Sequence, residues 1–581
     1  SDAGTTISGQ RGISVSASGA GAITLDLAGS VTGDGGSLLG FDDGIYVVST
    51  GAATVDITTA DVTGSNNGIY VSSAGTTTID TTAGAVTGST ALDGTGIYVT
   101  NTAGAVSVTT ADVSSAGGVF VQTAGTGNVT VDTTAGTVTA TIANGVSAYQ
   151  LGASGNVTVT TADVSTTSGN AAVDAEANNG VVTVDTTAGA ITGGGAYGVI
   201  GATNDGNVNI ATGDVSGGTG VWALVNFTGD IDVDTTAGTV TGATGAGILA
   251  DAGTGNVTVD SAAVGGVTSG INASTGGAGT VTVNASGTVT ASAGDGVVAT
   301  SDSGAVTIDT AAVTATGGDG IDASSTTGSI DIGTTGAVSG QRGIAASTGG
   351  AGTVTVLTGG STTGSAGAGI SATSGSGLID IETGAFLTQG STDGISATST
   401  TGNIDILTAG VVTGVTGTGI VASTGGSVNI DANGDVNGVT GVNATSTGAG
   451  GTVTVDTASI VTSTGGDGIV ATSLDGAVLV TANGINATGG DGIDASSTTG
   501  AITVTSSGAI VTTDNGIIAS TAGNVVVNVN ADITAGGAYG VDAESTGGSS
   551  TVNIAAGVTI DPADFGVSTV AATDATILGG A

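Results

Sequence analysis

Acidic residues are the groups in this sequence most able to do chemistry, and many of them recur at one place in a repeating pattern. The 581-residue chain has 46 Asp and Glu against 2 Lys and Arg, a formal net charge of −44. Seven acids that each follow a Val or Ile define this acidic ladder: Asp56, Asp80, Asp132, Asp185, Asp234, Asp260 and Asp309. Stacked carboxylates suit Ca²⁺ as hard oxygen ligands. The alternative is a charged face that favours solubility and keeps molecules from sticking side by side.

The acids also alternate between two positions along part of the chain. Units that lack an acid at the ladder position carry one a few residues later, at Asp112, Asp163 and Asp214. Like charges stacked ~4.8 Å apart would repel each other. The sequence therefore predicts two acidic columns that alternate from one unit to the next.

A second acidic pattern points to a metal. The segment GGDGIDASS occurs at 317–325 and again at 489–497. Each copy resembles one turn of the calcium-binding nonapeptide GGxGxDxUx, although that motif works as tandem copies. The metal candidates are Asp319, Asp322, Asp491 and Asp494, and Ca²⁺ is the one cofactor we consider.

Aromatic residues form the other candidate contact surface. Tyr46, Tyr70 and Tyr98 share one outward position in three successive units, and Trp222 lies near Phe227 in a later unit. The tyrosines are expected to stack on one another first, and the patch could then contact a partner or a sugar ring.

The absent residue types exclude several functions. The chain has no Cys and no His, which removes thiolate sites, imidazole ligands and the Ser-His-Asp triad. Two arginines without lysine cannot neutralise nucleic-acid phosphates. No apolar run is long enough for a transmembrane helix. Polysaccharide-active enzymes on this type of fold place basic or aromatic groups beside clustered acids, but Arg11 and Arg342 are 331 residues apart, so we predict a non-enzyme.

The elements that must position these residues follow from an internal repeat. A Gly-Ile or Gly-Val dipeptide (Ala-Val once), the anchor, recurs 23 times at intervals of 22–28 residues after a first interval of 32. Each unit reads as three short strands with alternating apolar and polar residues. Such units predict an all-β, right-handed parallel β-helix of about 23 coils with a core of small aliphatic residues. The anchor glycine is expected either to adopt a positive φ or to allow close approach between coils.

The domain organisation follows from the same repeat. We expect one continuous solenoid over residues 1–581, with a loop insertion at 33–43 after the first coil. The start at Ser1 suggests that a leader segment was removed or lies outside this sequence. One outward column, which includes Thr130, Thr158 and Thr183, invites an ice-binding interpretation, but the neighbouring column is mostly Asp or Asn rather than Thr.

The repeat style resembles a known family. Segments such as GIYVSSAGTTTIDTTAGAVTG (68–88) and GNVTVDTTAGTVTA (127–140) resemble passenger regions of type V autotransporter adhesins, especially those of alphaproteobacteria. The resemblance implies export, a β-helix on the bacterial cell surface and a C-terminal outer-membrane barrel, although the closing residues ATDATILGGA lack the strand pattern of a barrel.

The predicted function is that of a secreted or cell-surface, non-catalytic β-solenoid in surface adhesion or an extracellular layer. Its partners would be a host surface, an abiotic surface or a glycan. The alternative is a filament subunit that joins copies of itself end to end. A calcium-stabilised solenoid, an ice-binding solenoid and a polysaccharide-active enzyme are less favoured alternatives.

Overall fold

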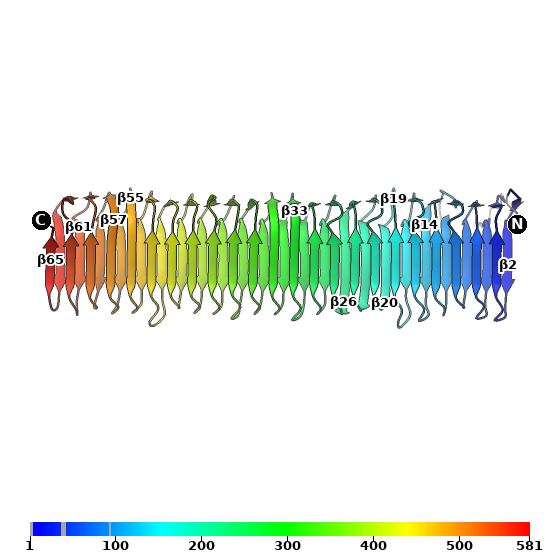
Figure 1. The fold of residues 1–581 in the computed structure, drawn as a ribbon, viewed down its shortest axis with the longest axis horizontal. Helices are drawn as coiled ribbons and strands as arrows, with labels where there is room; N and C mark the ends of the chain where they lie inside the picture. The colour runs from blue at the N-terminus through cyan, green and yellow to red at the C-terminus, as the bar shows by residue number, and fades with distance from the viewer. Residues whose placement is uncertain (1–3, 36–41, 92–93, 581) are drawn as a thin grey trace. The chain divides into compact units, whose positions relative to one another are not determined.

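The chain folds into strands and connecting turns. The computed structural model describes residues 4–35, 42–91 and 94–580, and the regular secondary structure in these ranges is all β-strand. Within them, no helix that could cross a bilayer is found. The chain divides into two compact units, Ser1–Ser292 and Ala293–Ala581, and within each unit successive coils lie side by side as a parallel β-solenoid (Figure 1).

A coil contains three strands, as the repeat predicts. The coil that begins at Gly118 has β14 (Gly117–Thr123), β15 (Val129–Thr133) and β16 (Val138–Ala140). Each strand pairs in parallel with the equivalent strand of the next coil, so that Val131 of β15 lies opposite Val159 of β18 (Val157–Thr161). Equivalent residues therefore form columns along each unit, which confirms the predicted β-solenoid.

The first strand of each coil contains the anchor dipeptide or begins at its second residue. In the first unit these strands are β2 (Ile13–Ala17), β5 (Ile45–Ser49), β8 (Ile69–Ser73), β11 (Thr95–Asn101), β14, β17 (Val146–Gln150), β20 (Ala171–Asn179), β23 (Tyr197–Asp205), β26 (Thr219–Thr228), β29 (Ile248–Ala252) and β32 (Ser269–Thr275). In the second unit they are β34 (Asp295–Ser301), β36 (Ile321–Ser325), β39 (Ile344–Thr348), β42 (Ile370–Ser374), β45 (Ile395–Ser399), β48 (Ile420–Thr424), β51 (Val442–Ser446), β54 (Ile469–Ser473), β56 (Ile493–Ser497), β58 (Ile517–Thr521), β61 (Tyr539–Ser545) and β64 (Phe565–Ala571).

In some coils the second and third strands run together. They form single strands in β33 (Val281–Ala291), β35 (Val306–Ala315), β55 (Val478–Ala487) and β57 (Ile502–Thr512). The same stretch in the Gly118 coil takes 12 residues, from Val129 to Ala140, whereas β33 takes 11. The length of the stretch does not decide this, because the one from Val106 to Ser115 takes only 10 residues and stays divided into two strands. Whether merged or divided, the second and third strands belong to one sheet.

Small aliphatic side chains fill the interior of each unit. Val129 and Val131 are 0% exposed, and Val138 is 1% exposed, while Thr130 between the first two points outward. Each fully buried Val or Ile contributes roughly 1.5–3 kcal/mol relative to an exposed one. The alternation within each strand therefore places the outward residues on a surface whose columns follow the repeat.

The anchor glycines permit close packing between coils. A Cβ atom on Gly68 would lie 2.5 Å from Val86 Cγ1 and 2.7 Å from the Gly96 carbonyl oxygen. Gly68 is not among the glycines with positive φ. Of the two predicted roles for the anchor glycine, Gly68 therefore allows close approach between coils and does not adopt a positive φ.

The predicted loop at 33–43 is described only at its ends. Gly33 is the last residue of β4 (Ser30–Gly33), and Asp42 and Asp43 are buried. Residues 36–41 lie outside the described residues.

Candidate functional site

The acidic ladder follows the register of the second strands. Asp80 of β9 (Thr77–Thr81) lies opposite Thr109 of β12 (Val106–Thr110), and Thr109 lies opposite Asp132 of β15. Asp132 lies opposite Thr160, which in turn lies opposite Asp185 of β21 (Val182–Thr186). The predicted alternation is confirmed in this part of the first unit.

Asp56 does not belong to this column. It lies on β6 (Val55–Thr59) opposite Thr24 and Thr78, whereas Thr58 is the residue opposite Asp80. The prediction was wrong here because β6 carries its acid one outward position earlier than β9, β15 and β21 do.

The ladder continues less regularly beyond Asp185. Asp234 and Asp260 lie directly opposite each other on β27 (Ile231–Thr235) and β30 (Val257–Ser261). Burial, followed by the charges of Asp260 and Asp234, raises the pKa of the neighbouring Asp232. Asp309, in the second unit, lies opposite Gly333. Acids therefore do stack in places, and ionisation of the neighbouring Asp232 is disfavoured there.

Most ladder acids are engaged in hydrogen bonds at the coil corners. The Asp132 Oδ1 atom accepts hydrogen bonds from the Thr134 backbone N–H (2.9 Å) and hydroxyl (2.7 Å), and Asp80, Asp185 and Asp234 make the same pair of bonds. Asp112 in the preceding coil accepts from the backbone N–H of Thr137 at 2.8 Å. The two columns thus cap the same corner from successive coils, a role that the sequence analysis missed although the recurrent DTTAG segment signals it.

The four metal candidates lie in two similar arrangements in the second unit. Asp319 accepts hydrogen bonds from Arg342 Nη2 (2.6 Å), Nε (3.0 Å) and backbone N–H (2.8 Å). Asp491 accepts from the backbone N–H (2.8 Å) and the Nδ2 atom (2.9 Å) of Asn515. Both therefore cap a coil corner with oxygens that Ca²⁺ would need.

The other two metal candidates lie on first strands. Asp322 lies on β36 and Asp494 on β56, and burial raises the pKa of both. Among the described residues, no group of three or more acidic side chains has an arrangement that could hold a metal ion.

The three predicted tyrosines form a stack on the outer face of the first strands. The ring centroids of Tyr46 and Tyr70 are 5.1 Å apart, those of Tyr70 and Tyr98 are 5.3 Å apart, and Phe120 continues the stack at 4.9 Å. The Arg11 guanidinium carbon lies 3.9 Å from the centroid of Tyr46, and Tyr149 meets Phe120 edge-on at the other end. The faces of these rings are used within the stack, so the predicted patch offers mainly ring edges and hydroxyls to a partner.

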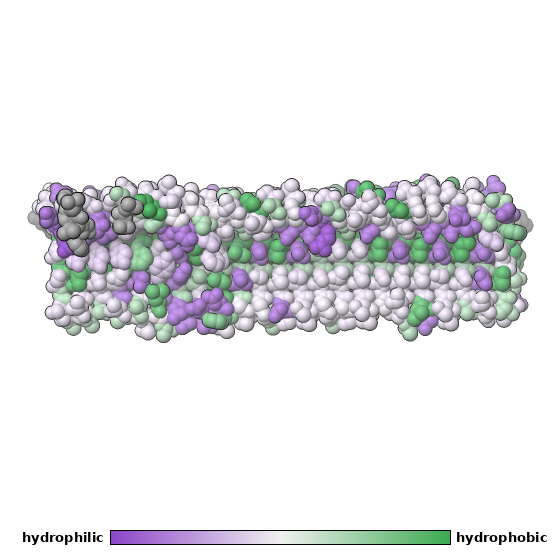
Figure 2. All heavy atoms as spheres, turned by 180° about the vertical axis from the view of Figure 1, so that it is seen from behind, coloured by the Kyte–Doolittle hydropathy of each residue, from purple (hydrophilic) through white to green (hydrophobic). Residues whose placement is uncertain are grey.

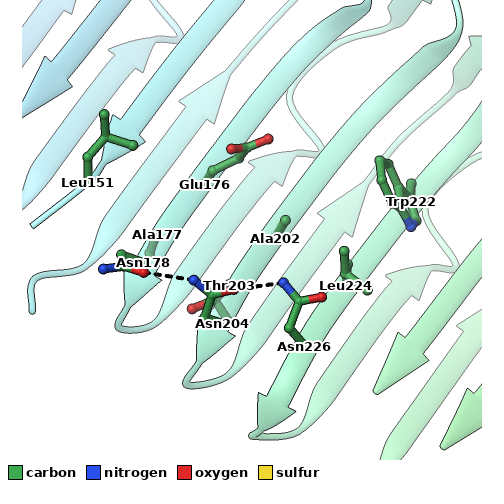
Figure 3. Close-up of a pocket in the computed structure, with 10 residues that line it drawn as sticks. All are labelled: Leu151, Glu176, Ala177, Asn178, Ala202, Thr203, Asn204, Trp222, Leu224 and Asn226. Carbon is green, nitrogen blue, oxygen red and sulfur yellow. Dashed lines mark hydrogen bonds between the residues drawn. The ribbon is translucent and has the colours of Figure 1, made fainter. Parts of the chain in front are cut away.

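Trp222 and Phe227 lie on the same strand, β26, in different surroundings. Trp222 is half-buried and its ring stacks on Tyr197 with centroids 4.9 Å apart. Phe227 lies near the end of β26 and is 61% exposed. The structure places Trp222, but not Phe227, in the lining of a groove (Figure 3).

This groove has a volume of about 370 Å³ and lies over β20, β23 and β26, which at 9, 9 and 10 residues are longer than most first strands. Its complete lining is Leu151, Glu176, Ala177, Asn178, Ala202, Thr203, Asn204, Trp222, Leu224 and Asn226. The three asparagines lie one coil apart and define the asparagine ladder (Figure 3). Nδ2 of Asn204 donates to Oδ1 of Asn178, and Nδ2 of Asn226 donates to Oδ1 of Asn204, both at 2.7 Å.

A pair of carboxyl groups lies at one side of the groove. Asp174 is 4% exposed, and its Oδ2 atom accepts hydrogen bonds from the Tyr149 hydroxyl (2.6 Å) and from Asn144 Nδ2 (3.0 Å). Its Oδ1 atom is buried and accepts no hydrogen bond from the residues that the structure describes. Burial, followed by the charge of Asp174, raises the pKa of Glu176 to about 7, while burial raises that of Asp174. A proton on Glu176 supplies Asp174 with a donor, so the pair favours one shared proton.

The sequence contained a signal for these residues that we did not use. The asparagines at 178, 204 and 226 each stand six positions after an anchor, in three successive units. The run VDAEA at 173–177 also places two acids on one face of a first strand. Neither pattern involves the second strands, which carry the predicted acidic ladder.

The repeat and these columns define the class of protein as a β-solenoid, in which many of the repeated acids cap coil corners and one face of the first unit carries a groove. Searches of protein-family models, curated proteins and solved structures find no match to this chain.

Proposed function

We propose that this chain is a non-catalytic β-solenoid of a bacterial cell surface that acts in surface attachment. One observation carries the proposal. The repeated acids cap coil corners, whereas Glu176, Trp222 and the asparagine ladder stand outside the repeat and share one groove. Residues that depart from a repeat and line a common groove are the natural candidates for contact with a partner.

The rest of the surface fits a display role. Figure 2 shows bands of near-neutral hydropathy along one face, beside a band in which hydrophilic and hydrophobic residues alternate. Outward columns such as Ser347, Thr373 and Thr398 consist of small hydroxyl residues, which offer few strong contacts. The resemblance to type V autotransporter passengers supports placement on the outside of a cell.

Location and attachment are tested together. Antibodies against the purified chain should label intact cells of the source organism, and beads coated with the chain should adhere to a target surface more than beads coated with an unrelated acidic protein. Labelling only after permeabilisation would contradict the proposal. Electron microscopy of the concentrated chain separates the filament alternative, which requires long fibres instead of discrete particles.

A further inference from the structure

We propose that the groove over β20, β23 and β26 binds a neutral hexose unit of a glycan chain. The inference rests on the proposed function and names the ligand through which attachment would occur.

Ala202 creates the space. It lies opposite Glu176 of the preceding coil and opposite Leu224 of the following coil. Equivalent residues two coils apart are ~9.6 Å from each other, because adjacent strands are spaced by ~4.8 Å. The methyl group of Ala202 leaves a depression between two larger side chains (Figure 3). The whole groove has a volume of about 370 Å³, which lies in the range of small-molecule sites, ~300–1,000 Å³.

The walls of the groove suit the two kinds of surface that a sugar ring presents. Trp222 and Leu224 supply apolar contact on one side, and stacking on Tyr197 holds the indole in place. Glu176 lies on the opposite side and the asparagine ladder lies along a third (Figure 3). An apolar wall facing a small number of fixed polar groups is the usual construction of such a site.

The asparagine ladder is ordered before any ligand arrives. Each hydrogen bond between two side-chain amides of the ladder uses one N–H donor of one asparagine and one oxygen acceptor of the next. An amide has two N–H donors and an acceptor with two lone pairs, so capacity remains at each residue. Because the amides are already held, they can bond sugar hydroxyls with little loss of side-chain entropy.

Charge selects among sugars. The groove contains Glu176, with Asp174 behind it, and no basic residue in its lining. A uronic acid or a sulfated sugar would meet these carboxyls without a compensating cation. A protonated amine on the sugar is not required either, because a pKa of about 7 leaves Glu176 partly protonated at neutral pH. Neutral hydroxyls can both donate to and accept from a carboxyl group that holds a proton part of the time.

Trp222 makes the test specific, because it is the single tryptophan of the 581-residue chain. The full chain is titrated with hexamers of glucose, mannose and galactose, and the emission of Trp222 is recorded. Hexamers of galacturonate and glucosamine serve as the anionic and cationic comparisons. At least one neutral hexamer should change the emission saturably, and it should bind at least about tenfold more tightly than either charged hexamer.

Two variants locate the binding. Ala202→Leu fills the depression and should weaken binding at least about tenfold, whereas Ser347→Leu, at the equivalent outward position of β39, should leave affinity within about twofold. Glu176→Gln should weaken binding, whereas Glu544→Gln, in the similar VDAES segment of β61, should not. Circular dichroism confirms that each variant folds like the parent.

Three results would overturn the inference: no saturable change with any neutral hexamer, tighter binding of a charged hexamer, or full affinity in Ala202→Leu. If the inference fails while intact cells are still labelled and coated beads still adhere, the surface function stands and only the ligand assignment is lost.

Discussion

The carboxyl pair beside the groove makes local stability depend on pH. Burial and the charge of Asp174 raise the pKa of Glu176 from 4.5 to about 7, so the folded state holds a proton that the unfolded state releases. For an acid whose pKa rises on folding, stability is highest below the unfolded value, falls as the pH rises from about 4.5 to about 7, and is level above that. Glu176→Gln mimics the protonated form and should remove this loss.

The magnitude follows from the shift. A change from 4.5 to about 7 corresponds to about 3.4 kcal/mol at 1.36 kcal/mol per pKa unit. Glu176 is only half-buried, and solvent screens part of the interaction, so about 1–2 kcal/mol is expected. At pH 8 this difference multiplies the opening equilibrium of the local structure about 5–30-fold.

Local opening is best measured by hydrogen exchange, because a repeat solenoid does not unfold as one two-state unit. Peptides that cover β20 and β23 should exchange about 5–30-fold more slowly in Glu176→Gln than in the parent at pH 8, and equally at pH 4.5. Glu544→Gln is the matched control, because its neighbour Asp542 is half-exposed where Asp174 is buried. Equal exchange of the parent and Glu176→Gln at both pH values would refute the electrostatic argument.

Three further substitutions test the coil contacts by the same exchange measurement. Asp112→Ala removes a corner cap and should cost about 1 kcal/mol in its own and the following coil, whereas exposed Asp302→Ala should cost less than half of that. Gly68→Ala places a Cβ atom 2.5 Å from Val86 Cγ1 and should open its coil, while Gly19→Ala, with nothing within 4 Å, should be tolerated. Val131→Ala empties part of the core and should cost about 2 kcal/mol. An undisturbed exchange pattern in any of the three would contradict the packing or bond it removes.

The coil and its register were predictable because they are set by short-range rules. Alternation in the segment from Val129 to Val131 fixes which side chains point inward, and the anchor spacing fixes which residues share a column. The merger of strands in β33 was not predicted, since a stretch of the same length from Val354 to Gly364 keeps the two strands apart. The displaced position of Asp56 was missed for a similar reason, because a shift by two residues preserves the alternation.

The groove was less predictable because its parts come from separate coils. Burial, followed by the charge of Asp174, raises the pKa of Glu176, and Asp174 is held by a hydrogen bond from Tyr149 of the preceding coil. Ala202 looks unremarkable in sequence, and it matters only because its neighbours across the register are larger. Such features arise from differences between adjacent units. A repeat pattern shows only what the units have in common and therefore does not indicate them.

The contrast between residues shared by the units and residues that differ between them also bears on the acids. It explains why a repeat with so many acids need not be a metal-binding or catalytic surface. An Asp that recurs at a corner, such as Asp112, lowers the free energy of each coil by capping an N–H that would otherwise lack a partner. Repetition of such a residue is accounted for by the fold alone. The Asp174–Glu176 pair has no such account, since a buried acid beside a second acid costs free energy in the folded state. This costly arrangement occurs beside a groove and is not repeated in β61, the strand with the similar sequence. Contact with a ligand should therefore be tested there first.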